Sequence, residues 1–229
     1  MIKAIITDIE GTTSSLSFVK DSLFPYARTH LAEFVQANAN SETVQKLLTD
    51  VNAEVGTDLT LAQAIDQLIA WIDTDQKITP LKSLQGLIWE AGYQNGELIG
   101  HLYPDAIRNL KTWKAQGFDL YIYSSGSVYA QKLLFAHTEA GDLTPLFSGY
   151  FDTHIGGKRD SNSYENIVAH IGLAAEQLLF LSDIEEELDA AQAAGLHTIW
   201  LIRDEQPEAG ATHWQVIDFD AIELDRLTS

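Results

Sequence analysis

Apolar positions repeat with two different periods along the chain, and the change of period divides it into segments. Near the N-terminus, residues 3–7 form a short apolar run rich in β-branched side chains, which is typical of a buried strand. From residue 16 to about residue 99, apolar side chains instead recur every three or four positions, as on one face of a helix. We therefore expect a strand followed by an all-helical segment.

The helical segment carries end signals for four helices. Ser41 is a suitable N-cap for the second helix, and Pro80 fits the first turn of the fourth, where a missing N–H is tolerated. Pro25 either begins a new helix or kinks the first one. The expected helices cover residues 18–35, 41–55, 61–72 and 80–91.

Beyond residue 99, short apolar runs alternate with helical patterns, which indicates a parallel sheet covered by helices on both faces. The expected strands are 119–123, 151–155, 178–181, 197–202 and a last short one at 216–219. The expected helices are 104–117, 128–136, 161–171 and 184–194.

The order of these elements predicts two domains. A parallel crossover normally needs one helix, so the four helices after the first strand are interpreted as an insertion. The fold class is α/β: a Rossmann-like parallel sheet core, residues 1–15 and 100–229, with an inserted all-helical domain, residues 16–99. Starting at the carboxyl end of the first strand, the insertion is suited to act as a lid that excludes water.

Composition narrows the classes of partner and compartment. The formal net charge of -19 argues against nucleic acid and anionic membranes as partners, because both require basic surface. The chain has no cysteine, which excludes disulfides and cysteine zinc sites, and its seven histidines show no i,i+4 pair. We expect neither a signal peptide nor a membrane span. The expectation is a cytoplasmic monomer that binds a small molecule.

Polar side chains suited to catalysis or metal binding follow four of the expected strands. Because the ends of parallel strands meet at one edge of a sheet, these groups are expected to surround a single pocket. Each alone also has a plain structural explanation, such as a helix N-cap, a solvated lysine or an acidic helix start. The groups are Asp8 with Glu10, Ser124 with Ser125, Lys158, and Asp183.

Taken together, these groups suit phosphoryl transfer. Asp8 and Asp183 offer the hard oxygen ligands that Mg²⁺ prefers, and a carboxylate can also act as the nucleophile. A serine hydroxyl beside backbone N–H groups can hold phosphate oxygens. Lys158 supplies a cation for the remaining negative charge.

The order of these motifs resembles that of the haloacid dehalogenase superfamily of phosphohydrolases. Its first motif is Asp-x-Asp-Gly-Thr, and here Glu10 stands at the second acidic position. That departure makes the chain similar to the enolase-phosphatase (acireductone synthase) family of methionine salvage. Supporting stretches cover nearly the whole chain and thin after about residue 203. They are residues 18–27, 84–93, 100–105, 121–128, 131–135, 151–164 and 180–191.

The resemblance implies a role for each candidate. Asp8 is implied as the catalytic carboxylate and a metal ligand, and Asp183 as the last metal ligand. Glu10 is implied to bind the metal through its backbone carbonyl, with its side chain a candidate acid or base. Ser124, Ser125 and Lys158 are implied to bind the substrate phosphate, and Lys158 is also implied to act as the catalytic cation. Glu187 lies at a later acidic position and is not assigned to the metal.

The implied cofactor is one Mg²⁺ per subunit, and the helical insertion resembles a cap domain. The implied reaction converts 2,3-diketo-5-methylthiopentyl 1-phosphate to the acireductone 1,2-dihydroxy-3-keto-5-methylthiopentene and phosphate. Two alternatives stay open: a generic Mg²⁺-dependent capped phosphatase of another small metabolite, and a signalling module that accepts a phosphoryl group on Asp8. The four-helix insertion argues against the signalling module.

Overall fold

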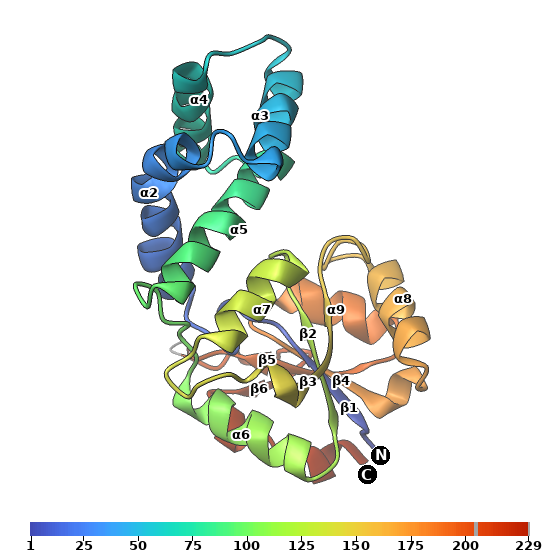
Figure 1. Cartoon of the computed structure of the whole chain (residues 1–229). Coiled ribbons are helices and arrows are strands. Elements are labelled where there is room, and N and C mark those ends of the chain that lie inside the picture. Colours follow the sequence, from blue (N-terminus) through green and yellow to red (C-terminus); the bar gives the residue numbers. More distant parts are fainter. Residues whose placement is uncertain (204–205, 229) are drawn as a thin grey trace. The chain divides into compact units, whose positions relative to one another are not determined.

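The computed structural model describes residues 1–203 and 206–228 and divides into two compact units. One unit combines Met1–Leu16 with the residues from Gly100 onward, and the other is Ser17–Ile99 (Figure 1). None of the helices in the described part of the chain combines the length and apolar character needed to cross a membrane.

The first unit contains a six-stranded parallel sheet in the order β3-β2-β1-β4-β5-β6. The central strands β1 and β4 are buried along their whole length, which explains their uninterrupted apolar sequences. The strand order reverses at β1, and ligands of open α/β sheets bind beyond the carboxyl ends of strands at such a point. The strands are β1 (Ala4–Thr7), β2 (Asp119–Tyr123), β3 (Phe147–Phe151), β4 (Leu178–Ser182), β5 (His197–Leu201) and β6 (Trp214–Val216).

Alternate side chains of the central strands enter two separate cores. Ile5 packs with α6 (Pro104–Ala115) and with the C-terminal 3₁₀ turns on one side. Ile6 packs with α8 (Ser161–Ile171) and α9 (Glu185–Ala193) on the other side. This confirms the predicted sheet with helices on both faces, because successive strand residues point to opposite faces.

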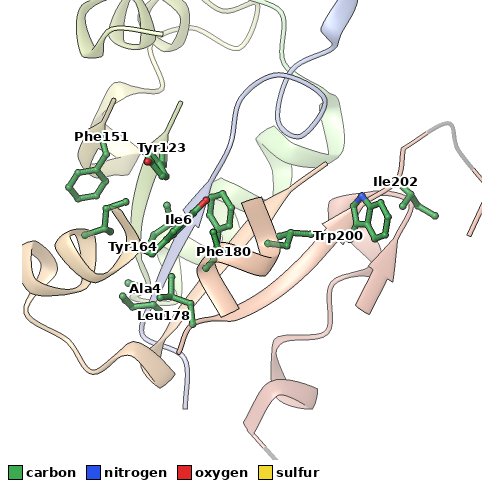
Figure 2. Packing of buried hydrophobic residues seen from close by; sticks show 14 residues of the cluster. Ala4, Ile6, Tyr123, Phe151, Tyr164, Leu178, Phe180, Trp200 and Ile202 are labelled. Carbon is green, nitrogen blue, oxygen red and sulfur yellow. The ribbon is translucent and has the colours of Figure 1, made fainter. Parts of the chain in front are cut away.

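The second core is rich in aromatic side chains. The ring centroids of Tyr123 and Tyr164 lie 5.5 Å apart, and those of Tyr164 and Phe180 lie 5.1 Å apart (Figure 2). All three residues are fully buried. Tyr123 is the last residue of β2, and Tyr164 lies in the first part of α8. This core therefore joins the end of β2 to the start of α8.

Both outer strands differ from the sequence prediction. The strand expected at 151–155 is wrong: β3 is Phe147–Phe151, and Asp152 begins a turn in which its carboxylate accepts a hydrogen bond from the His154 N–H. The strand expected at 216–219 is also wrong, because β6 ends at Val216 and Phe219 begins a 3₁₀ turn. Edge strands are half exposed, so their apolar pattern is weak.

Most helices of the second unit begin at residues that the sequence indicates. Ser41 caps α3 (Glu42–Val55) by accepting a hydrogen bond from the Val44 N–H, as predicted. Pro25 lies in the first turn of α2 (Phe24–Ala37), which follows a π-helical turn, so it begins a helix. Pro80 likewise lies in the first turn of α5 (Thr79–Gln94). The short α1 (Leu16–Phe18) precedes these helices, and α4 (Leu61–Asp73) completes the unit.

Candidate active site

The candidate site lies beyond the carboxyl ends of β1, β2 and β4. Asp8 directly follows β1, and its N–H donates to the Leu181 carbonyl of β4 at 2.9 Å. Ser124 directly follows β2, and its N–H donates to the Phe151 carbonyl of β3 at 3.2 Å. The sheet ladder thus extends to the first residue of each polar turn, which fixes the position of both backbones.

A buried lysine connects two acidic side chains. The Lys158 Nζ lies 2.7 Å from the Asp8 Oδ1 and 2.5 Å from the Glu187 Oε2. The Ser182 hydroxyl donates to that same Glu187 oxygen at 2.9 Å. Burial disfavours the charged ammonium, but the two carboxylates outweigh this effect and raise the pKa of Lys158. Burial, together with the charge of Asp8, raises the pKa of Glu187.

The backbone around Lys158 is held by hydroxyl groups from the core. The carbonyls of residues 156–158 accept hydrogen bonds from the hydroxyls of Tyr123 at 3.0 Å, Ser163 at 2.7 Å and Tyr164 at 2.7 Å. The two tyrosine rings contact each other edge to face in the core (Figure 2). The position of the ammonium therefore depends on core packing, although the segment itself has no regular structure.

The turn after Asp8 and the carboxylate of Asp183 lie in close contact. Gly11 has a φ of 71°, and a Cβ on it would lie 2.0 Å from the Asp183 Oδ2, so only glycine fits. The Thr12 hydroxyl donates to the Asp183 Oδ1 at 3.3 Å. The Trp200 indole N–H donates to the Asp183 carbonyl at 2.9 Å. Strand β5 thus supports the turn after β4.

The site carries more negative than positive charge. Burial, followed by the nearby charge of Asp8, raises the pKa of Asp183 from its usual 3.8 to about 7. The site holds three carboxylates, those of Asp8, Asp183 and Glu187, and the ammonium of Lys158 contacts only the first and the last of them. A divalent cation between Asp8 and Asp183 would balance the excess negative charge. The hard carboxylate oxygens of these two residues suit Mg²⁺.

The acidic side chains do not form a conventional three-carboxylate metal cage. Among the described residues, no group of three or more His, Cys, Asp or Glu side chains is arranged to hold a metal ion. Asp8 and Asp183 still fit Mg²⁺, which is usually bound by one or two carboxylates and keeps several waters. The side chain of Glu10 is exposed, and its backbone forms a bridge with Ser14.

The serine turn after β2 is anchored by a buried amide. Ser124 is buried and its hydroxyl accepts a hydrogen bond from the Gly126 N–H at 3.3 Å, whereas Ser125 is exposed. The Gln131 amide group donates to the Gly126 carbonyl and to the Phe151 carbonyl, each at 2.8 Å. This arrangement fixes the turn that presents the Ser124 hydroxyl.

Two charged groups of this region were not selected by the sequence argument as parts of the site. Glu187 lies in the first turn of α9 and pairs with Lys158, and its spacing from Asp183 is the only sequence signal for it. Arg203 follows β5 and donates to the Thr12 carbonyl at 3.1 Å. The strand-end rule, applied to this fifth strand, marks Arg203 as a candidate but does not show its contact with Thr12.

Comparison with known proteins gives three kinds of match. Residues 2–195 match the family model of the haloacid dehalogenase-like hydrolases. A relative from Methylococcus capsulatus named Enolase-phosphatase E1 is 56% identical over 228 residues, which cover 99% of this chain and 100% of the relative. A relative of the same name from Citrobacter koseri is 54% identical over 230 residues, covering 100% of both.

Solved structures agree with the fold. The UTR4 protein of Saccharomyces cerevisiae has a TM-score of 0.84 and 33% identity, with 97% of this chain and 100% of that chain covered. The L-2-haloacid dehalogenase of Xanthobacter autotrophicus has a TM-score of 0.58 and 17% identity, with 100% and 98% covered. The second match is evidence for the shared fold alone.

Proposed function

The chain belongs to the haloacid dehalogenase-like hydrolases, and we propose that within this family it is an enolase-phosphatase (acireductone synthase) of methionine salvage. The proposed reaction enolises 2,3-diketo-5-methylthiopentyl 1-phosphate and removes its phosphate, giving the acireductone 1,2-dihydroxy-3-keto-5-methylthiopentene. The observation that carries this proposal is the 56% identity to a protein named Enolase-phosphatase E1, which extends over the whole of that relative.

Asp8 is the proposed nucleophile of the phosphatase step. Its Oδ1 accepts a hydrogen bond from the Ile9 N–H at 2.8 Å and contacts Lys158, so among the described contacts Oδ2 is the oxygen left to attack phosphorus. A bond forms between Oδ2 and phosphorus while the bond to the substrate oxygen breaks, and that oxygen keeps the electron pair. Water then attacks the aspartyl-phosphate and releases phosphate.

Lys158 is the proposed cation for this step, and Ser124 and Ser125 are the proposed phosphate contacts. The ammonium is held by two carboxylates before substrate arrives, so it needs little reorganisation when negative charge develops on the transferring group. The anchored turn after β2 likewise presents the Ser124 hydroxyl in a fixed place. These supports favour a preorganised site over a flexible one.

Asp8, Asp183 and the Glu10 backbone carbonyl are the proposed ligands of one Mg²⁺ per subunit. Mg²⁺, when bound, supplies positive charge for the phosphate and for the enediolate that forms on enolisation. Glu10 is the proposed acid or base that moves the proton, because its exposed side chain can exchange protons with solvent. The proposed cap domain is the helical segment 16–99, and the proposed enzyme is a cytoplasmic monomer.

The test is product analysis with the diketone phosphate. Enol absorbance and free phosphate are followed together in the presence of Mg²⁺, then after chelation and after Mg²⁺ is restored. We expect both products, reversible loss on chelation, and no phosphate release by Asp8→Asn in a folded protein. Release of phosphate from generic esters without turnover of the diketone would instead identify another capped phosphatase. A long-lived phospho-Asp8 without multiple turnover would identify a signalling module.

A further inference from the structure

The side chain of Arg203 reaches from the end of β5 to the turn that follows Asp8. We propose that Arg203 is a positioning residue, which holds this turn in the shape that receives the divalent cation. The inference rests on the proposed function, because the cation is the one assigned above to Asp8 and Asp183. Arg203 lies outside the stretch 2–195 that matches the family model, so the general family motifs do not include it.

The guanidinium makes a forked contact with one carbonyl of the turn. Its Nε donates to the Thr12 carbonyl at 3.1 Å, and its Nη2 donates to the same oxygen. Thr12 is fully buried, and its hydroxyl donates to the Asp183 Oδ1. Arg203 is therefore linked through a single residue to a proposed metal ligand, without touching the metal position itself.

The guanidinium is fixed on its other sides as well. Its Nη1 lies 2.8 Å from the Asp105 Oδ2, an oxygen that also accepts a hydrogen bond from the Phe219 N–H at 2.9 Å. The ring centroid of Tyr103 lies 3.9 Å from the guanidinium carbon. The side chains of Arg203 and Asp105 are only 12% and 14% exposed, so little solvent is available to replace these contacts.

The local backbone is consistent with a specialised role. Arg203 has a φ of 39°, in the left-handed region that few non-glycine residues adopt. Such conformations persist where surrounding contacts over-determine them, and they gather at functional sites. The Tyr103 N–H also donates to the Thr13 carbonyl at 2.9 Å, so two successive carbonyls of the turn are held by hydrogen bonds from outside the turn.

The turn after Asp8 is closed by its own amides, which converge on one acceptor. The N–H groups of residues 12–14 donate to the Ile9 carbonyl at 3.3, 3.0 and 2.8 Å. Without the guanidinium, the Thr12 carbonyl loses two donors and the turn is free to relax away from Asp183. Outer-shell partners of metal ligands typically change metal affinity by about 10- to 100-fold when they are removed.

The experiment uses the full-length chain and two substitutions at this position. Arg203→Met removes the charge and the fork, and Arg203→Lys keeps a charge for Asp105 but cannot donate the same fork to the carbonyl. The matched control is Arg108→Met, since Arg108 also pairs with an aspartate, Asp220, but at 58% side-chain exposure. Mg²⁺ affinity is measured by titration calorimetry, and hydrogen exchange of amides 12–14 is measured in the metal-free protein.

We expect both Arg203 variants to bind Mg²⁺ about 10- to 100-fold more weakly and to exchange amides 12–14 faster, while Arg108→Met matches the wild type. If Arg203→Met does not fold, Arg203→Lys carries the test. Affinity and exchange within twofold of the wild type in a folded Arg203 variant would overturn the proposal. Failure of the wild type to bind Mg²⁺ would instead refute the proposed metal site, and the exchange of amides 12–14 would still decide whether Arg203 holds the turn.

Discussion

Replacing Asp183 with asparagine should stabilise the metal-free protein, although it removes a proposed metal ligand. The folded protein raises the pKa of Asp183 from 3.8 to about 7, first through burial and then through the charge of Asp8. A raised folded-state pKa contributes stability that is fully present below pH 3.8 and is lost as the pH rises through about 7. At pH 8 the ionised Asp183 therefore weakens the metal-free fold.

The size of the effect follows from the shift. About three pKa units, at about 1.36 kcal/mol each, correspond to about 4 kcal/mol at pH 8, which is an upper limit because solvent screens the partly exposed carboxyl. Asparagine keeps an oxygen that can accept the Thr12 hydrogen bond but carries no charge. Asp183→Asn should thus gain a few kcal/mol over the wild type at pH 8, and much less near pH 4.

The measurement is urea unfolding in chelator between pH 4 and pH 8, for the wild type and Asp183→Asn. The matched control is Asp50→Asn, which changes an exposed aspartate of α3 and should leave the free energy of unfolding unchanged at every pH. Added Mg²⁺ should stabilise the wild type at pH 8 but not Asp183→Asn. If Asp183→Asn were no more stable than the wild type at pH 8, the ionised carboxylate of Asp183 would not destabilise the metal-free protein, and the reasoning would be refuted.

Three further substitutions test other parts of the site. Lys158→Met leaves two partner carboxylates buried without their cation, so the free energy of unfolding should fall by about 3–5 kcal/mol. Phosphate release should fall about 10²–10³-fold, and unchanged turnover would remove Lys158 from the mechanism. Gly11→Ala places a Cβ 2.0 Å from the Asp183 Oδ2 and should abolish Mg²⁺ binding in calorimetry, whereas retained affinity would mean that the turn can shift. Tyr164→Phe removes the hydroxyl bonded to the Lys158 carbonyl and should cost about 1–3 kcal/mol of unfolding free energy with reduced phosphate release; wild-type values in both assays would show that this anchor is dispensable.

The central part of the sheet could be predicted because its sequence is constrained on both faces. β1 and β4 are buried throughout, so each is an uninterrupted apolar run that admits few other interpretations. β3 contains Ser148 and Gly149, and a Cβ on Gly149 would lie 3.1 Å from the Tyr121 ring. Its identity as a strand depends on pairing with β2, which no local pattern reveals.

The candidate site shows the same limit. Asp8 and Asp183 each follow a strong strand, and the strand-end rule is sufficient to select them. Glu187 and Arg203 contact residues far away in the sequence, Lys158 and Thr12 respectively. A charged residue in an acidic helix or after a strand is usually solvated, so only the folded structure shows that these two are held in the site.

The order of the strands has a consequence for synthesis of the chain. β1 is made first but lies between β2 and β4, and the 17–99 insertion and five further strands are made after it. One edge of β1 therefore has no partner until β4 has left the ribosome, and Arg203 reaches Thr12 later still. We expect the nascent chain to hold Asp8 in an unformed site until these later segments have been made. The proposed nucleophile would then become competent only after β4, β5 and Arg203 have been made.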